Sequence, residues 1–315
     1  MSFGTTWGIY LESDVLEYYR KAGRVAGEAR EYGASLIAPG VKALDVVTKI
    51  EEYVTGHGAQ IAFPSTLSIN DMAAHYTPKH DDTLTFRKGD LVKVDVGAHV
   101  EGYIGDTAMT VEVGGTNHYT MLREAVEDAL DIAIGLLQPK APLNLIGGAI
   151  EQTIESFGFK PISNLTGHSL KQYVLHAGLS VPNIRDMTSD RVKEGDVLAV
   201  EPFATTGVGK VDGRKPGNIY RMGRIKSTKY RKVVEFIQIN YRTLPFAERW
   251  LYPHVKHLGF TLNSLIRNGI IQPYSILSEI SKGMVSQKEH TVIITRDGCE
   301  VTTDVTGTYG SVRNR

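Results

Sequence analysis

Two short segments of the chain share one pattern, in which a mostly apolar strand runs from a Gly-Asp pair to a carboxylate. The first comprises Gly89-Asp90, Leu91–Val94 and Asp95, and the second comprises Gly195-Asp196, Val197–Val200 and Glu201. In both segments the last acid lies five residues after the aspartate. A carboxylate in an apolar strand is costly to bury unless it is paired or bound to a metal. The repeat therefore predicts a pseudo-symmetric domain whose halves each direct one strand-borne acid towards a common centre.

The remaining pattern predicts a mixed α/β (α+β) fold. Helical spacing of apolar residues runs from Ser13 to about Gly56, and Ala38-Pro39-Gly40 should divide it into two helices. Further helices are expected over Thr120–Leu137 and Asn144–Phe157. Hairpins are expected over Leu91–Val113, with its turn near Glu101-Gly102, and over Glu289–Val305, with its turn at Asp297-Gly298.

Two further acids and one histidine are candidates for the same site as Asp95 and Glu201. If the first hairpin turns at Glu101-Gly102, Asp106 lies almost opposite Asp95, at a Cβ separation of about 4.5–5.5 Å. Glu289 precedes another apolar run, Thr291–Ile294, and His168 offers one imidazole. Four buried carboxylates need positive charge nearby, and two divalent ions such as Mn, Fe, Co or Zn would supply it.

Each of these residues taken alone has a simpler interpretation. A single strand acid is more often a salt-bridged or solvated carboxylate than a metal ligand. His168 alone is more often a hydrogen-bonded loop histidine. Only the occurrence of all five together favours a dinuclear metal site.

Charge and cysteine content exclude some classes of protein. Lys and Arg number 35, as do Asp and Glu, so the chain is not a general polyelectrolyte binder. Residues 209–256 are nevertheless basic, with twelve Lys or Arg against Asp212, Glu235 and Glu248. Cys299 is the only cysteine, which rules out an intramolecular disulfide and suits a reducing compartment. Met1–Thr6 shows no secretion signal, so we expect a cytoplasmic protein that does not span a membrane.

Seven short strings, in order along the chain, resemble those of type 2 methionine aminopeptidases. They are Ala73-Ala74-His75-Tyr76-Thr77-Pro78, Val94-Asp95-Val96-Gly97, Gly105-Asp106, Thr166-Gly167-His168, Leu175-His176-Ala177-Gly178, Val200-Glu201-Pro202-Phe203 and Glu289-His290-Thr291. The long insertion after Glu201 and the short N-terminus are similar to those of archaeal members. The resemblance implies a pita-bread fold with a pseudo-two-fold repeat, formed by residues 1–207 and 274–315. It also implies that residues 208–273 form an inserted helical, winged-helix-like subdomain.

For function, the resemblance implies removal of the initiator methionine from nascent proteins and peptides. The implied metal ligands are Asp95, Asp106, His168, Glu201 and Glu289, of which Asp106 and Glu289 bridge two ions. Two such ions can activate a water between them and polarise the scissile carbonyl. Glu201 would carry a proton from that water towards the leaving amine.

The resemblance also assigns substrate-binding residues. His75 and His176 match two histidines that hydrogen-bond the scissile amide and the developing oxyanion. Phe63, Leu175 and Tyr274 match the methionine pocket, although residues of these types are more often plain core residues. Some relatives place a histidine from the insertion at the pocket wall, whereas this chain has Asn218-Ile219-Tyr220 there.

Two alternatives remain at the sequence level. An Xaa-Pro peptidase of the same fold would use the same metal ligands, and a non-catalytic pita-bread protein would bind RNA or protein partners, usually after losing those ligands. The basic residues 209–256 are most simply a solvated face, with docking against ribosomal RNA as the alternative. We expect a monomer, and no catalytic role for Cys299, since nothing nearby would lower its pKa.

Overall fold

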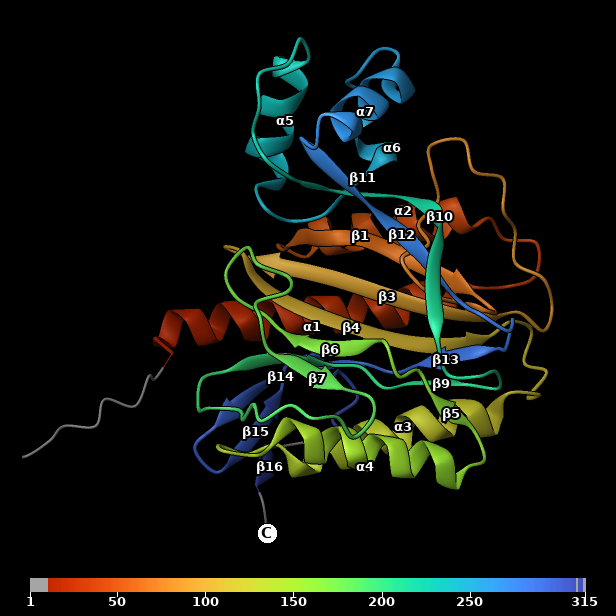
Figure 1. The fold of residues 1–315 in the computed structure, drawn as a ribbon, viewed down its shortest axis with the longest axis vertical. Helices are drawn as coiled ribbons and strands as arrows, with labels where there is room; N and C mark the ends of the chain where they lie inside the picture. The colour runs from red at the N-terminus through yellow and green to blue at the C-terminus, as the bar shows by residue number, and fades with distance from the viewer. Residues whose placement is uncertain (1–10, 310, 314–315) are drawn as a thin grey trace, which may run out of the picture.

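The computed structural model describes residues 11–309 and 311–313 (Figure 1). The expectation for Met1–Thr6 therefore lies outside the described residues. Pairs of helices and blocks of strands follow one another along the described chain, which confirms the predicted mixed α/β content. Among the described residues, no helix has the length and apolar character needed to cross a membrane.

The first half of the catalytic fold consists of two helices on an antiparallel sheet. Its elements are α1 (Ser13–Ser35), α2 (Ala43–Gly56), β1 (Gln60–Ile69), β2 (Met72–Ala74), β3 (Leu91–Val100) and β4 (Tyr103–Glu112). The sheet has the order β1-β3-β4, and α1 packs against β3 and β4. The break between α1 and α2 and the β3–β4 hairpin confirm the predictions for this region. Glu101 and Gly102 both have positive φ, as a two-residue hairpin turn requires.

The second half repeats the arrangement of paired helices and antiparallel strands. Its elements are α3 (Thr120–Leu136), α4 (Leu143–Ser156), β5 (Lys160–Pro161), β6 (Thr166–Ser169), β7 (Ser180–Pro182), β8 (Val197–Val200), β9 (Phe203–Thr205), β13 (Val285–Gln287), β14 (His290–Thr295), β15 (Gly298–Val301) and β16 (Ser311–Arg313). One sheet has the order β16-β15-β14-β8-β6-β7, and a smaller one has the order β13-β9-β5. The predicted helices and the β14–β15 hairpin are confirmed.

The apolar residues of α3 show why this helix forms and what it covers. Leu122, Val126, Leu130 and Ile134 recur at helical spacing and are all buried. They pack with α4 and with strand residues such as Leu198 into one core. Burial of this apolar stripe therefore fixes the helix pair against the β8–β14 sheet.

The two Gly-Asp turns have matching geometry in the two halves. The Asp90 carboxylate accepts a hydrogen bond from Arg87 N at 2.7 Å, and the Asp196 carboxylate accepts one from Lys193 N at 2.7 Å. Gly89 and Gly195 have φ of 87° and 85°, which favours glycine at both positions. The internal repeat therefore corresponds to a repeated turn that starts an acid-bearing strand.

Between β9 and β13 the chain forms a separate layer of structure. It contains β10 (Val211–Met222), α5 (Arg231–Tyr241), β11 (Phe246–Ala247), α6 (Glu248–Leu251), α7 (Leu258–Arg267) and β12 (Ile271–Glu279). The long strands β10 and β12 pair with each other and connect to β2, in a sheet of order β11-β10-β12-β2. The three helices lie at the opposite end of the molecule from α3 and α4 (Figure 1). They enclose a core of their own, which includes Ile237, Phe246 and Leu265.

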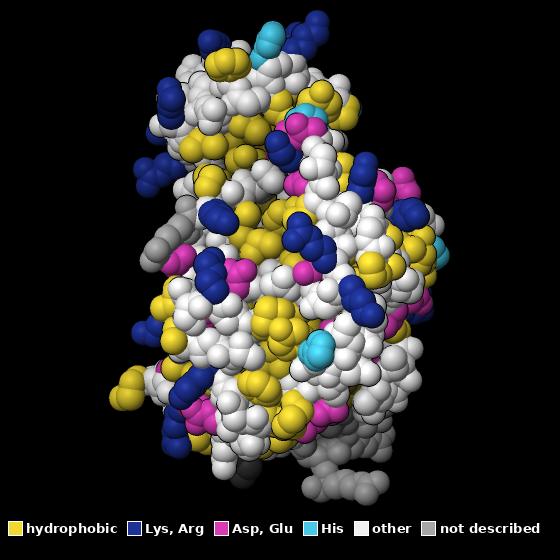
Figure 2. Space-filling model, turned by 90° about the vertical axis from the view of Figure 1, so that its right-hand side faces the viewer, with side chains coloured by type: hydrophobic (Ala, Val, Ile, Leu, Met, Phe, Trp, Pro, Cys, Tyr) yellow, Lys and Arg dark blue, Asp and Glu magenta, His cyan; other side chains and the backbone are white. Residues whose placement is uncertain are grey.

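The charged side chains do not gather into one continuous patch on the face drawn in Figure 2. Lys and Arg side chains are spread over both the upper and the lower parts of this face, among neutral and acidic ones.

Candidate metal centre

The sequence-predicted site residues come together around one cavity between the two halves and the inserted segment. It is lined by Phe63, His75, Asp95, Asp106, His168, Leu175, His176, Glu201, Tyr274 and Glu289, which are all ten of the predicted residues. Thr66, Ala74, Ile219, Pro245 and Gln287 complete the lining. Residues more than 200 positions apart in the sequence therefore share one site.

Asp95 and Asp106 lie on the same face of the β3–β4 hairpin. Asp95 pairs with Ala108 in the strand register, and Asp106 pairs with Gly97. The two acids are therefore offset by two residues, rather than almost opposite as predicted from the sequence. The two-residue turn at Glu101-Gly102 sets this register, because it places Val100 beside Tyr103. The diagonal offset leaves more space between the carboxylates than a direct pair would.

Glu289 is fixed against the strand that carries Asp106. Its backbone N–H donates to Ala108 O at 2.9 Å, and its carbonyl accepts from Thr107 Oγ1 at 2.8 Å. Thr291 strengthens the junction, since its hydroxyl lies 2.8 Å from both the backbone N and the O of Asp106. These contacts hold Glu289, a residue only 1% exposed, beside Asp106.

His168 and Glu201 come from neighbouring strands of the second half. His168 is on β6, opposite Ala199 of β8, and Glu201 follows the last residue of β8. His168 Nε2 lies 3.7 Å from Asp106 Oδ2 and 3.6 Å from Glu201 Oε1. Ligand atoms of Asp106, His168 and Glu289 all lie within 4.8 Å of one another, which suits a shared cation.

The electrostatics of the four acids favour a bound cation. Burial, reinforced by repulsion from the other carboxylates, raises the pKa of Asp106, Glu201 and Glu289 well above the ordinary value. Burial also raises the pKa of Asp95 to about 7. Asp95 Oδ1 is buried without a hydrogen-bond partner. Several carboxylates close together, one of them with an oxygen that has no hydrogen-bond partner, form the kind of donor set that binds a divalent metal ion.

The histidines around the acids are neutral. Burial lowers the pKa of His168 to about 3, with a further contribution from His176, and lowers that of His176 to about 4. Burial also lowers the pKa of His75. His75 Nδ1 lies 3.1 Å from Ser275 O, and a carbonyl can only accept, so Nδ1 carries the proton and Nε2 has a lone pair. Neutral imidazoles suit both metal binding and substrate hydrogen bonding.

The apolar part of the cavity combines predicted and unpredicted residues. Phe63, Leu175 and Tyr274 line it, and the ring of Tyr274 meets that of His75 edge-on at 5.2 Å. Ile219 and Pro245 of the inserted segment also line it. Asn218 instead donates its side-chain amide to Thr77 O at 3.1 Å.

Gln287 is a polar site residue that the sequence analysis missed. Its Nε2 lies 3.2 Å from Glu201 Oε2 and 3.2 Å from Glu289 Oε2. It therefore orients two of the predicted ligands. Its position two residues before Glu289, on the same side of an extended segment, is the signal that could have indicated it.

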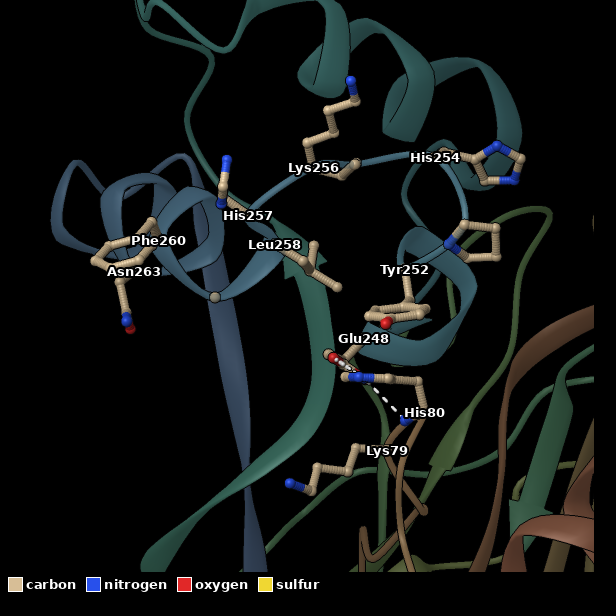
Figure 3. Close-up of a pocket in the computed structure, with 13 residues that line it drawn as sticks. Lys79, His80, Glu248, Tyr252, His254, Lys256, His257, Leu258, Phe260 and Asn263 are labelled. Carbon is tan, nitrogen blue, oxygen red and sulfur yellow. Dashed lines mark hydrogen bonds and ion pairs between the residues drawn. The ribbon is translucent and has the colours of Figure 1, made fainter.

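A larger groove lies between the inserted segment and residues 79–80, and it shares no lining residue with the acidic cavity (Figure 3). Its volume is about 970 Å³, and it is lined by residues 79–80, Glu248 and residues 252–260 with Asn263. Glu248, the one acid among the described lining residues, is hydrogen-bonded to His80. The groove therefore lacks the clustered acids that distinguish the buried cavity.

The chain is similar to known metallopeptidases over almost its whole length. The model of metallopeptidase family M24 matches residues 17–296. A methionine aminopeptidase from Methanocaldococcus jannaschii is 45% identical over 296 residues, which cover 93% of this chain and 100% of that protein. One from Pyrococcus horikoshii is 43% identical and covers 90% of this chain and 98% of that protein.

Solved structures agree with this assignment. A methionine aminopeptidase from Thermotoga maritima matches with a TM-score of 0.69 and 25% identity, over 94% of this chain and 98% of that one. The structure of a thermophilic Arx1 has a TM-score of 0.80 at 19% identity, over 93% of this chain and 91% of that one, and so shares the fold. The predicted pita-bread fold is thereby confirmed. The chain belongs to metallopeptidase family M24, among its methionine aminopeptidases.

Proposed function

We propose that this chain hydrolyses the peptide bond after an N-terminal methionine in peptides and nascent proteins. The observation that carries the proposal is the convergence of four carboxylates, two buried and two partly buried, and His168 on one cavity with an apolar wall. Methionine aminopeptidase relatives that align with over 90% of the chain support the same activity. Family membership implies a divalent metal, and the acidic donor set fits one.

Five residues would hold the metal, and we propose two ions of Co, Mn, Fe or Zn. The residues that would hold them are Asp95, Asp106, His168, Glu201 and Glu289, of which Asp106, His168 and Glu289 bring ligand atoms within 4.8 Å of one another. Two ions would compensate the four negative charges that burial otherwise disfavours. When bound, such ions activate water and polarise a carbonyl at neutral pH.

Three side chains would then act on the substrate. Glu201 would take a proton from the attacking water at a carboxylate oxygen and deliver it to the leaving amine. His75 would accept the N–H of the scissile amide at Nε2, because its Nδ1 proton is held by Ser275 O. His176, neutral at pH 7, would donate to the oxyanion that develops on the carbonyl.

The methionine side chain would occupy the apolar wall of the cavity. We propose that Phe63, Leu175 and Tyr274 contact the thioether, together with Ile219 and Pro245. A methionine buries well against such residues because its unbranched thioether adapts to irregular apolar surfaces.

The inserted segment and the cellular setting complete the proposal. Residues 208–273 would act as a subdomain on a catalytic domain formed by residues 1–207 and 274–315. The enzyme would act in the cytoplasm, as a monomer, on newly made chains. Its basic residues are most simply a solvated face, and docking on the ribosome would require binding that weakens as salt rises.

The decisive experiment compares wild type with Glu289→Ala for metal-dependent cleavage of Met-Ala-Ser, alongside quantification of bound metal. Glu300→Ala is the matched control, because this acid lies on β15 and pairs with Arg20 outside the cavity. We expect Glu289→Ala to lose metal and activity, and Glu300→Ala to retain both. Equal activity of wild type and Glu289→Ala would remove the basis for the ligand assignment.

The same purified protein distinguishes the alternative functions. An Xaa-Pro peptidase would cleave Xaa-Pro substrates and leave Met-Gly and Met-Ala peptides intact. A non-catalytic binding protein would cleave neither set at any metal concentration.

A further inference from the structure

Helix α6 of the inserted segment contacts the backbone just after His75. Arg249 Nη1 donates to Thr77 Oγ1 at 2.7 Å and to Pro78 O at 3.1 Å. The other terminal nitrogen of the same guanidinium pairs with Glu51 of α2. One planar side chain therefore ties the segment after His75 to a helix of the first half.

Glu51 is the buried centre of this network. Its carboxylate, in a residue only 8% exposed, accepts from Ser65 N at 3.2 Å and from Trp250 Nε1 at 2.9 Å, besides Arg249. Thr77 Oγ1 in turn donates to Ser65 O at 2.7 Å. Elements α2, β1 and α6 and the segment after His75 thus meet in one hydrogen-bonded cluster. Removal of one partner from a charge pair this deeply buried strongly destabilises the folded protein, because the other charge stays buried without compensation.

A second, outer contact joins α6 to the segment after His75. His80 Nδ1 lies 2.7 Å from Glu248 Oε1, and Tyr252 stacks on the His80 ring at 3.6 Å (Figure 3). The His80 backbone N–H also donates to Glu248 Oε2 at 3.1 Å. The outer contact is more exposed than the inner one, so solvent screening weakens its ionic part.

His75 lies between two attachments, one to β12 and one to α6. On one side Ser275 O of β12 accepts its Nδ1 proton. On the other side Arg249 holds Thr77 and Pro78. His75 itself has φ of 69°, a backbone conformation that costs free energy for a non-glycine residue and persists only when its surroundings enforce it.

We propose that Arg249 and Glu51 are positioning residues for His75, so that the inserted segment controls turnover as well as lining the pocket. This inference rests on the proposed function of His75 as a substrate hydrogen-bond acceptor. Arg249→Lys keeps the charge but loses the planar fork, so it cannot bond Glu51, the Thr77 hydroxyl and the Pro78 carbonyl together. His75 would then lose its enforced conformation while the metal ligands stay in place.

The test is a double-mutant cycle on Met-Ala-Ser with wild type, Arg249→Lys, His75→Ala and the double variant. We expect Arg249→Lys to lower kcat roughly 10- to 100-fold with little change in KM, because small misplacements of a catalytic group have effects of this size. Bound metal should be unchanged. In the His75→Ala background, Arg249→Lys should change kcat by no more than about twofold, the usual limit for additivity.

Two further variants keep the test decisive. Arg20→Lys is the matched control, because Arg20 makes a similar two-nitrogen contact with Glu300 away from the cavity, and its kcat should equal that of wild type. Glu51→Gln keeps the size of the side chain and replaces Arg249→Lys in the cycle if that variant does not fold.

The possible outcomes separate this inference from the proposed function. Wild-type kcat in His75→Ala would refute the role of His75 itself. A slow His75→Ala with an Arg249→Lys at wild-type kcat would refute only the positioning role. Equal fold-losses from Arg249→Lys with and without His75 would also refute it, since a purely structural residue acts independently of His75.

Discussion

Asp95→Asn should stabilise the metal-free protein and abolish its metal-dependent activity. Burial raises the pKa of Asp95 to about 7, against the ordinary 3.8. Its Oδ1 has no hydrogen-bond partner, and Oδ2 has one weak donor, Thr66 Oγ1 at 3.5 Å. In the absence of a cation the ionised carboxylate is therefore an unfavourable group in the folded state.

The size of the effect follows from the pKa difference. A carboxyl whose pKa is higher in the folded state than in the unfolded state destabilises the fold as pH rises. The loss begins at the pKa of the unfolded state and is complete once pH exceeds the pKa of the folded state. Since one pKa unit is worth about 1.4 kcal/mol, ionising Asp95 above pH 7 costs roughly 4 kcal/mol. A buried asparagine amide without good partners costs about 1–2 kcal/mol. The net gain in the free energy of unfolding for Asp95→Asn is thus about 2–3 kcal/mol at pH 8 and near zero at pH 5.

Calorimetric or chemical unfolding in EDTA at both pH values measures this difference. Adding Mn²⁺ at 1,000 times its Kd for wild type should reverse the order, because ligand at that concentration stabilises wild type by about 4.1 kcal/mol and the variant much less. If Asp95→Asn is the less stable protein at pH 8 in EDTA, the premise that these carboxylates oppose folding without metal is wrong.

Three other predictions test separate parts of the site. His176→Asn should lower kcat roughly 100- to 1000-fold, the usual loss for one oxyanion donor, while bound metal measured by mass spectrometry stays constant; loss of metal would contradict the assignment. Gly97→Ala would place a Cβ 2.1 Å from Phe63 Cε1, so the Phe63 ring must move. The substitution should lower the free energy of unfolding by about 1–3 kcal/mol and raise KM for methionyl peptides. An unchanged KM would show that Phe63 does not contact the methionine side chain. Metal binding should release protons, more at pH 6 than at pH 8, because the four acids have raised pKa values. The affinity for metal should therefore rise with pH. Calorimetry in buffers of different ionisation enthalpy measures the released protons, and metal binding without proton release would contradict the raised pKa values.

Local rules predicted the parts of the fold that depend on short segments. The Gly89-Asp90 and Gly195-Asp196 turns, the Glu101-Gly102 hairpin and the helix break before Ala43 all depend on residues next to one another. The acids in apolar strands could be identified from the sequence, because a buried carboxylate needs a positive charge or a hydrogen-bond donor nearby, whichever part of the chain supplies it. The ten residues predicted for the site share one cavity, although their individual roles stay predictions.

The remaining features depend on contacts between distant parts of the chain. Ile219 and Pro245 carry no motif, and they reach the cavity only because β10 pairs with β12 and β11. The Glu51–Arg249 pair joins residues 198 positions apart. The offset of Asp95 from Asp106 is local by contrast, because the predicted two-residue turn at Glu101-Gly102 already pairs Asp95 with Ala108 and so excludes an almost opposite pair of acids.

The matching halves of the fold do not place their two repeated acids in equivalent surroundings, and this difference bears on which acid moves a proton. Asp95 lies within β3, paired on both sides by Thr66 and Ala108, so the sheet fixes its backbone. Glu201 follows the last residue of β8, outside the strand pairing, and its side chain has one more methylene group. A group that carries a proton between water and a leaving amine must change its contacts during the reaction. Glu201 alone of this repeated pair combines a cavity position with that freedom, which supports its assignment as the proton carrier and that of Asp95 as a fixed ligand.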